Sequence, residues 1–363
     1  MTAHRELAQR RLRHQRLHGP ALPSPAEVVG WLGAVQSQDY NAAKWALALR
    51  TTGATNEAID RLFDEGAIIR THVMRPTWHF VLPADLRWLL ALTAPRVHIA
   101  NRGPYRELEL DDDVLLRCRR TLERVLQGGN ALTRDELEAA LQADGIELTK
   151  RRLVHITMYF ELEALICSGP RRGKQHTYVL VEERVPPAPV LGRDEALAEL
   201  TRRYYASHGP ATPHDFAWWS GLTVSDARRG IELNGGRLAS EQFGDQRYWF
   251  DPSTTTEQAA QPLVHLLPNF DEHVVAYRDH APSVDPAVIT ALPPNELLFK
   301  PHPIARDGLV IGTWRSAVAK RGAKITANLL IPADDTLQAG LHAAAEAYGA
   351  YIGLPTSVVI EAA

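Results

Sequence analysis

One order of elements recurs along this chain: helices followed by two short strands that a turn joins. In the first copy, apolar residues at helical spacing predict the helices, and runs rich in β-branched residues predict the strands. The expected elements are helices over residues 5–17, 25–35, 41–50 and 56–65 and strands over 68–73 and 77–81. Helices followed by a β-hairpin are typical of a winged-helix unit, so the sequence predicts one here.

The same order occurs twice more. The second copy comprises a helix that begins in a capping box at residues 133–136, a helix over 149–163, and strands over 165–167 and 177–181. A proline-rich linker at residues 185–189 ends this copy. The third copy comprises helices over 193–207, from 212 onward and over 223–233, and strands over 237–242 and 248–250. Three such units in one chain predict an array.

The last hundred residues have a different pattern, in which short β segments dominate. These segments are expected over residues 263–267, 274–277, 297–300, 309–314 and 325–331, followed by a helix over 336–351 and a strand over 356–360. A small barrel fits this pattern. We therefore predict an α+β fold of three tandem winged-helix units and a small C-terminal β-barrel. The predicted domains are residues 1–110, 111–190, 191–256 and 257–363.

Composition excludes several classes of protein. Hydrophobic residues make up 45% and charged residues 23% of the 363, which is typical of globular proteins, and no apolar run approaches the roughly 18 residues of a membrane helix. Five arginines precede residue 17 without an apolar stretch behind them, so we expect no secretory signal and a cytoplasmic protein. The two cysteines, Cys118 and Cys167, are expected to be reduced and buried.

Charge is distributed unevenly along the chain. The net charge of −3 argues against a wholly basic nucleic-acid binder. Residues 1–100 nevertheless hold 12 Lys or Arg against 8 Asp or Glu, whereas residues 251–300 hold 2 against 7. Arginine supplies most of the positive charge, which suits phosphate contacts but is equally explained by genome composition.

Sequence signatures of nucleotide and metal sites are absent. There is no Walker A sequence, no glycine-rich dinucleotide fingerprint, no H-E-x-x-H and no paired C-x-x-C. The three acids at residues 111–113 are better explained as the N-cap and first turn of a helix than as metal ligands. His302 and the segment 271–273 lack a second ligand at a diagnostic spacing. We expect neither a metal nor a cofactor.

A cluster of basic residues marks the hairpin of the second copy. Arg171, Arg172 and Lys174 lie in its turn, and residues 150–152 supply further positive charge at the start of the preceding helix. This arrangement resembles a wing and a recognition helix that contact DNA phosphates. The alternative is a solvated surface turn. Because both clusters belong to one unit, we favour contact with DNA.

Two glutamines two residues apart, Gln36 and Gln38, follow the helix expected over 25–35. In extended backbone, residues at i and i+2 face the same way, so both carboxamides could converge on one small target. Carboxamides are not strong bases, but they can hold a water by hydrogen bonds, which suffices when the leaving group is already activated. On residue types alone, a helix C-cap with polar surface residues is the commoner explanation.

Four ordered motifs give the chain a resemblance to a known family. They are residues 34–39, 71–79, 267–272 with 276–279, and 312–315. With these motifs the chain resembles the AlkZ-like winged-helix DNA glycosylases, bacterial enzymes that release alkylated bases. In that family a glutamine-x-glutamine pair carries catalysis, and Gln36 and Gln38 fall on it. A sister branch has an acid at the second position. The middle residue is usually apolar and here is Ser37.

The resemblance implies a function and a partner. It implies a monofunctional DNA glycosylase that acts on bulky N7-alkylated purines and unhooks interstrand crosslinks such as those left by azinomycin, in DNA repair and self-resistance to a genotoxin. The implied partner is double-stranded DNA, held in a concave cleft. We expect a monomer associated with the nucleoid. N7 alkylation places a positive charge on the purine, so the enzyme need mainly stabilise an oxocarbenium-like sugar and place a water.

Two other functional hypotheses remain open. The chain could be a non-enzymatic winged-helix DNA-binding protein, either a regulator or a lesion-binding shield. Alternatively, a carboxylate such as Asp39 or Asp271 carries catalysis, although an ion pair between Asp271 and Arg278 would make Asp271 structural.

Further residues are candidates for contact with DNA in the cleft: Arg75, His79, Trp314 and Arg315. Because Trp78 and His79 alternate along a strand, at least one of them should face the core. Lys44 is the lysine nearest to the glutamine pair in sequence, and its position in a helix predicts a surface residue.

Overall fold

The computed structural model describes residues 3–254, 263–291 and 302–362, which fold into two compact units. The first unit comprises residues 1–59, 198–219 and 223–363, and the second comprises 60–197 and 220–222. The boundary of the first unit falls inside the first predicted winged-helix domain. The division into four domains and the assignment of three winged helices stay predictions, whereas the mixed α+β fold is confirmed.

The N-terminal helices of the first unit agree with their predicted positions. They are α1 (Ala3–His14), α2 (Pro25–Leu32), α3 (Tyr40–Ala48) and the start of α4 (Asn56–Glu65). Helices α1 and α3 begin one or two residues earlier than predicted, α1 to α3 end two or three residues earlier, and α4 has the predicted bounds. Ser24 caps α2 by accepting from the N–H of Glu27, and Pro25 occupies the first turn. The helix ends at Leu32 because Gly33 adopts a positive φ of 81°, which favours glycine. Residues 35–36 are thereby released into the short strand β1 (Val35–Gln36).

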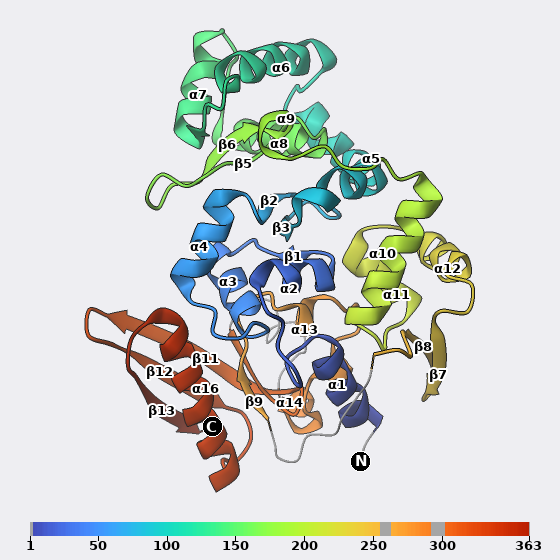
Figure 1. Cartoon of the computed structure of the whole chain (residues 1–363), viewed down its shortest axis with the longest axis vertical. Helices are drawn as coiled ribbons and strands as arrows, with labels where there is room; N and C mark the ends of the chain where they lie inside the picture. Colours follow the sequence, from blue (N-terminus) through green and yellow to red (C-terminus); the bar gives the residue numbers. More distant parts are fainter. Residues whose placement is uncertain (1–2, 255–262, 292–301, 363) are drawn as a thin grey trace. The chain divides into compact units, whose positions relative to one another are not determined.

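A curled five-stranded sheet forms the C-terminal part of the first unit (Figure 1). Its strands, in the spatial order β13-β12-β11-β10-β9, are Thr356–Ala362, Gly322–Leu329, Leu309–Ala319, His302–Arg306 and Val264–Leu266. Neighbouring strands are antiparallel except β12 and β13, which are parallel and are connected through α16 (Asp335–Ile352). The helix packs on β9 and β13. The predicted barrel is therefore present as a half-barrel.

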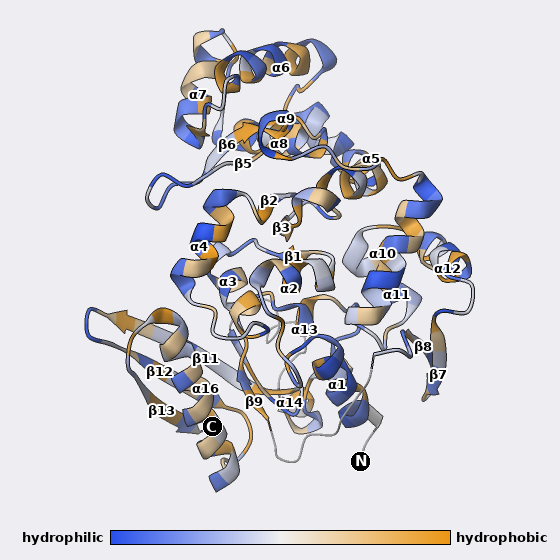
Figure 2. Ribbon diagram, viewed as in Figure 1, coloured by the Kyte–Doolittle hydropathy of each residue, from blue (hydrophilic) through white to orange (hydrophobic). Residues whose placement is uncertain are grey.

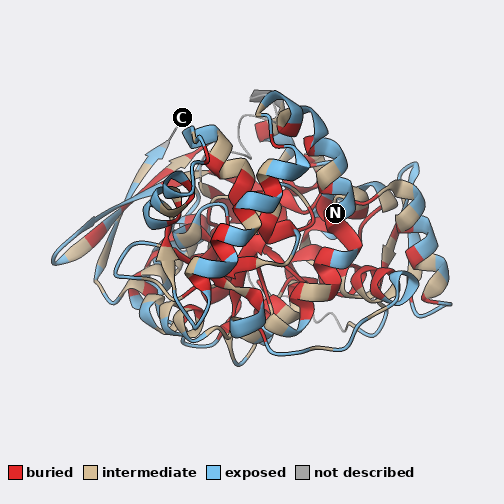
Figure 3. Ribbon diagram, turned by 90° about the horizontal axis from the view of Figure 1, so that it is seen from above, coloured by how far each residue is buried: buried red, intermediate tan, exposed pale blue. Residues whose placement is uncertain are grey.

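The third helix-helix-hairpin copy contributes α10 (Arg193–Ser207), α11 (Pro213–Ser220), α12 (Val224–Leu233) and the hairpin β7–β8 (Ala239–Phe243, Gln246–Phe250). The hairpin turns at Gly244, whose φ of +58° suits a two-residue turn. Thr223 and Asp226 form a capping box at the start of α12. Helices at the surface carry buried residues on one face and exposed or half-buried residues on the other (Figure 3), and the burial pattern of α11 and α12 follows this rule.

The second unit contains the hairpin β2–β3 (Ile69–His72, Trp78–Val81) and the second copy. Its further elements are α5 (Pro83–Glu107), α6 (Asp112–Leu126), β4 (Leu132–Thr133), α7 (Arg134–Ala143), α8 (Lys150–Leu162), β5 (Ile166–Ser168), β6 (Thr177–Leu180) and α9 (Val181–Arg184). Strands β4, β6 and β5 form a sheet in that spatial order. The sequence analysis did not predict the long helix α5. Cys118 and Cys167 are free and buried, as expected.

Local signals in the second unit are confirmed. Asp111 caps α6 by accepting from the N–H of Val114, so the three acids are a helix start. Thr133 and Glu136 form the predicted capping box of α7. Apolar residues every three or four positions along α6 face a core that α6 shares with α7 and α8. Figure 2 shows this pattern as hydrophobic residues that alternate with hydrophilic ones around the helices.

One predicted strand is wrong, and another lies outside the described residues. The segment predicted as a strand over 274–277 instead belongs to a short helix, α13 (Glu272–Val275). Asp271 caps this helix by accepting from the N–H of His273, and that cap outweighs the β preference of the two valines. The strand predicted over 297–300 falls in the part that the structure does not describe.

Two helical glycines should respond differently to alanine. A Cβ at Gly230 in α12 would overlap Thr201 Oγ1, so Gly230→Ala should lower the free energy of unfolding by about 1–3 kcal/mol. A Cβ at Gly103 in α5 meets open space apart from its chain neighbours, but the ring of Pro104 disfavours helical backbone for a preceding residue with a Cβ. The gain in helix propensity is therefore offset, and Gly103→Ala should change the free energy of unfolding by less than about 1 kcal/mol. Urea denaturation of both variants measures this, and equal effects would contradict the packing at Gly230.

Candidate active site

The two glutamines lie in the connection between α2 and α3. Gln36 lies in β1 with only 8% of its surface exposed, Ser37 is buried, and Gln38 is exposed in the bend that follows. The connection is short and both of its ends are determined, since Gly33 ends α2 and Asp39 caps α3 by accepting from the N–H of Ala42. Convergence of the two carboxamides on one target stays a prediction.

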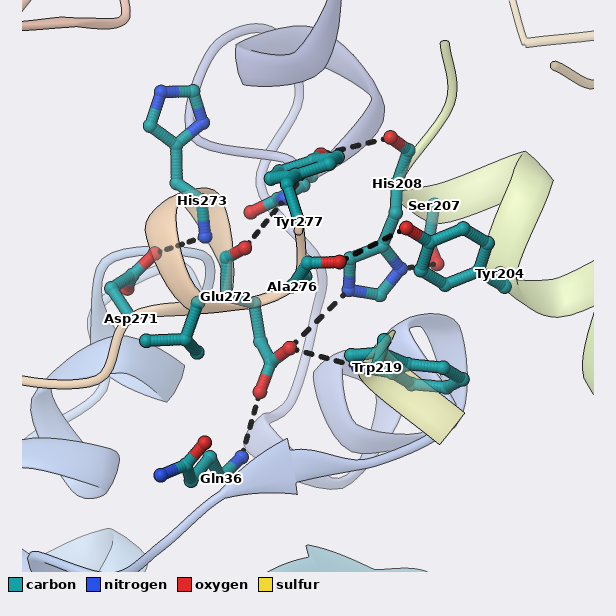
Figure 4. A network of polar contacts seen from close by, with 12 residues as sticks. Gln36, Tyr204, Ser207, His208, Trp219, Asp271, Glu272, His273, Ala276 and Tyr277 are labelled. Carbon is teal, nitrogen blue, oxygen red and sulfur yellow. Dashed lines mark hydrogen bonds and ion pairs between the residues drawn. The ribbon is translucent and has the colours of Figure 1, made fainter. Parts of the chain in front are cut away.

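A buried carboxylate holds the backbone of Gln36. The N–H of Gln36 donates to Glu272 Oε1 at 2.7 Å, and the indole N–H of Trp219 donates to Oε2 at 3.0 Å (Figure 4). His208 Nε2 lies 3.5 Å from the same Oε2. Glu272 is fully buried, so these neighbours replace the water that a carboxylate normally binds. Glu272 therefore helps to hold β1 in place.

The neighbouring acid, Asp271, forms a buried ion pair with Arg50. Arg50 Nη2 lies 2.7 Å from Oδ1 and Nη1 lies 2.9 Å from Oδ2, so the contact is bidentate. Burial raises the pKa of Asp271, but Arg50 outweighs it and the net pKa is lowered. The ion-pair partner of Asp271 is therefore Arg50 and not Arg278, because Arg278 is exposed whereas Asp271 is buried with both oxygens on Arg50. Asp271 is thus engaged in a structural contact.

Histidines beside these acids are packed as neutral groups. Burial lowers the pKa of His208, against Glu272, which raises it, and burial lowers the pKa of His273 to about 4. His208 Nδ1 lies 2.8 Å from Ser207 Oγ, and its carbonyl accepts from the hydroxyl of Tyr277. The cluster is therefore a rigid support under Gln36, and it offers no protonated imidazole at neutral pH.

The weaker candidates for DNA contact lie in different environments. His79 is fully buried, with Nδ1 3.0 Å from the carbonyl of Thr77, which confirms that one of Trp78 and His79 faces the core. Arg75 is half-buried. Trp314 is 4% exposed and its indole N–H donates to Leu267, whereas Arg315 is exposed and lies 3.5 Å from Glu361. Contact of these side chains with DNA stays a prediction.

The arginines of the basic hairpin form ion pairs within the second unit. Arg171 contacts Asp60 at 2.8 Å and Asp64 at 2.7 Å, and burial of Asp64 raises its pKa less than Arg171 lowers it. Arg172 lies 2.7 Å from Glu136. Their charge is thus compensated locally, whereas Lys174 is exposed at the turn.

Lys44 is buried, and the expectation of a surface position is wrong. Its side chain is 2% exposed and Nζ lies 5.0 Å above the ring of Tyr40. The reason is that α3 is buried on nearly all sides, with residues 42–48 all buried.

Other residues of the site escaped the sequence analysis. Trp219, His208 and Arg50 were not predicted to belong to it, and Glu272 appeared only as a part of the motif at residues 267–272. A single sequence does not indicate that this motif lies close to Gln36, because Gln36 and Glu272 are 236 residues apart.

Comparison with known proteins identifies the class of protein to which this chain belongs. The model of the family described as DNA glycosylase AlkZ-like matches residues 29–351. The chain therefore belongs to the AlkZ-like DNA glycosylase family, which confirms the resemblance seen in its motifs.

Two relatives extend this result. The chain is 26% identical over 340 residues to the interstrand DNA cross-link repair glycosylase of Streptomyces sahachiroi, with 84% of this chain and 85% of the relative covered. The solved structure of the Streptomyces sahachiroi DNA glycosylase AlkZ matches with a TM-score of 0.78 at 22% identity, covering 98% of this chain and 99% of that one. The two chains thus share a fold.

Within residues 3–254, 263–291 and 302–362, no helix is long and apolar enough to cross a bilayer. The same ranges contain no group of three or more His, Cys, Asp or Glu side chains placed to hold a metal ion.

Replacing Glu272 by glutamine should destabilise the protein. The amide of Glu272→Gln has one acceptor oxygen, so one of the two N–H donors from Gln36 and Trp219 faces an NH₂ group and stays unsatisfied. We expect a loss of about 1–3 kcal/mol in the free energy of unfolding, measured by urea denaturation. Glu346→Gln, an exposed position on α16, is the control and should change little. A midpoint equal to wild type for Glu272→Gln would contradict the supporting role.

Proposed function

We propose that this protein is a monofunctional DNA glycosylase that hydrolyses the N-glycosidic bond of bulky N7-alkylated purines. One observation carries the proposal: in a member of the AlkZ-like family, Gln36 and Gln38 lie in a connection whose backbone a buried carboxylate holds. The name of the Streptomyces sahachiroi relative supports crosslink unhooking as part of the activity, with azinomycin-type lesions as the proposed class.

The chemistry requires little from the protein beyond positioning. An N7-alkylated purine carries a positive charge and leaves with the electrons of the C1′–N9 bond, so no strong acid is needed. What remains is to stabilise the developing positive charge on the sugar and to direct a water at C1′. A carboxamide oxygen can accept a hydrogen bond from that water, and Gln38 is exposed where DNA can reach it.

The position of Gln36 fits a supporting role in the same reaction. Because Glu272 holds its N–H, its backbone cannot shift when DNA binds, which keeps the cost of ordering the site low. The proposed partner is double-stranded DNA, which a monomer would bind in a concave cleft. A location at the nucleoid follows from such a partner.

Loss of either glutamine should separate catalysis from binding. Gln36→Ala or Gln38→Ala should slow base release from a defined N7-alkylguanine duplex by about 10² or more while DNA affinity is retained. The double variant should be little worse than the worse single one, because the pair acts as a unit. The matched control is Gln338→Ala, an exposed position on α16.

The same assay tests the proposed function. The wild-type product should be a free base and an intact abasic strand that breaks only on alkali treatment, with EDTA having no effect. Tight binding without base release would instead support a regulator or a lesion-binding shield. Wild-type rates in both single variants would remove the glutamines from the mechanism.

The basic hairpin is best tested at Lys174. Reversing Arg171 would disrupt its ion pairs with Asp60 and Asp64, whereas Lys174 is exposed. Lys174→Glu should weaken binding to any duplex and reduce the slope of log affinity against log salt by about one, because a phosphate contact releases a counterion. Arg120→Glu makes the same change in charge at an exposed position of α6 and is the control. Equal slopes for both variants would identify the hairpin as solvated surface.

A further inference from the structure

A pocket of about 470 Å³ lies beside the glutamine segment, within the first unit. Asp39, which directly follows Gln38, is part of its wall, and aromatic side chains from three elements supply much of the rest: Trp45 of α3, Trp314 of β11, and Tyr348 and Tyr351 of α16. Its volume falls within the roughly 300–1,000 Å³ that is common for small-molecule sites. The buried cluster around Glu272 does not explain what this pocket does.

The aromatic rings are held in place before any ligand binds. Trp45 and Trp314 each lie 5.1 Å from Tyr348 between ring centroids, at 86° and 75°, which is edge-to-face geometry. The indole N–H of Trp45 donates to the carbonyl of Leu266, and that of Trp314 donates to Leu267, both at 2.7 Å. Ligand binding therefore costs little ordering of these side chains.

The same hydrogen bonds determine what the rings can recognise. Both indole N–H groups are used on backbone carbonyls, so neither indole donates a hydrogen bond to a ligand. Trp45, Trp314 and Tyr351 are at most 5% exposed, so the half-buried Tyr348 offers most of the accessible aromatic surface. The face of an aromatic ring favours a flat, positively charged ring over a neutral one.

The polar groups of the pocket also favour a positively charged ligand. Asp39 contributes a carboxylate, and among the described residues that line the pocket none is Lys or Arg. His302 Nδ1 accepts from the N–H of Asn269 at 2.8 Å, so the neutral imidazole carries its proton on Nε2. Burial lowers the pKa of His302, against Asp39, which raises it, so the imidazole adds no positive charge at neutral pH.

We infer that this pocket binds the positively charged ring of an N7-alkylated purine nucleoside. The inference rests on the proposed function and adds to it the site at which the damaged base is distinguished from normal ones. Aromatic faces and the Asp39 carboxylate attract the cationic ring, and the Nε2–H of His302 would donate to an acceptor on the base. When the C1′–N9 bond breaks, its electron pair stays on N9 and the ring becomes neutral, so the pocket loses its hold on the product.

Calorimetric titration of the full chain with three small probes tests the inference. The probes are 7-methylguanosine at mildly acidic pH, where it is a cation, and two neutral compounds, guanosine and the free base 7-methylguanine. We expect the cation to bind about tenfold more tightly than either neutral probe. Equal affinities would overturn the inference, as would failure of all three to bind.

Variants then locate the binding. Asp39→Asn keeps an oxygen that can cap α3 but removes the charge, so the preference for the cation should fall to about threefold or less. Tyr348→Leu removes a ring and should weaken binding of the cation more than binding of guanosine. Tyr348→Phe keeps the ring and should bind both probes as the wild type does. An undiminished preference in both Asp39→Asn and Tyr348→Leu would place the binding elsewhere and overturn the inference.

This test is separable from that of the proposed function. Release of base from alkylated duplex without any preference for the cationic nucleoside would contradict the pocket alone. A clear preference in a protein that releases no base would contradict the enzymatic function alone.

Discussion

The structure around the glutamine pair depends on one buried carboxylate. Glu272 accepts the N–H of Gln36 and the indole N–H of Trp219, and it lies close to His208. A carboxylate without water is costly unless donors surround it, so the segments that carry these donors must meet at α13. A residue in the C-terminal half of the chain thereby sets the backbone of one near the N-terminus.

The two adjacent acids have separate roles. Asp271 pairs with Arg50 and caps α13, while Glu272 holds β1. A buried ion pair gains little net stability over apolar packing, but breaking one partner leaves an uncompensated charge. The pair therefore favours one arrangement of α3 and α13 over others, and the connection with Gln36 and Gln38 starts from that arrangement. The proposed chemistry of this protein uses uncharged groups, and these groups are supported by buried, charged side chains that are rigidly held.

Much of the candidate site could be predicted, but its support could not. The ordered motifs identified the family, whereas the role of Gln36 and Gln38 in catalysis stays a prediction. The same reasoning considered Asp271 as a catalytic acid and Arg278 as its partner, because Arg278 is near in sequence. The actual partner, Arg50, lies 221 residues away, and no local pattern indicates such a pairing.

The sequence by itself determined the α+β class and most of the local elements, with α5 and α13 as exceptions. Caps such as Asp111 and Thr133 act within one turn of a helix, so they are readable from neighbouring residues. Tertiary structure decided that Lys44 is buried and that Arg171 is paired with acids. The physical reason is that burial and charge pairing depend on which distant segments share a core, whereas capping and periodicity depend on the nearest residues alone.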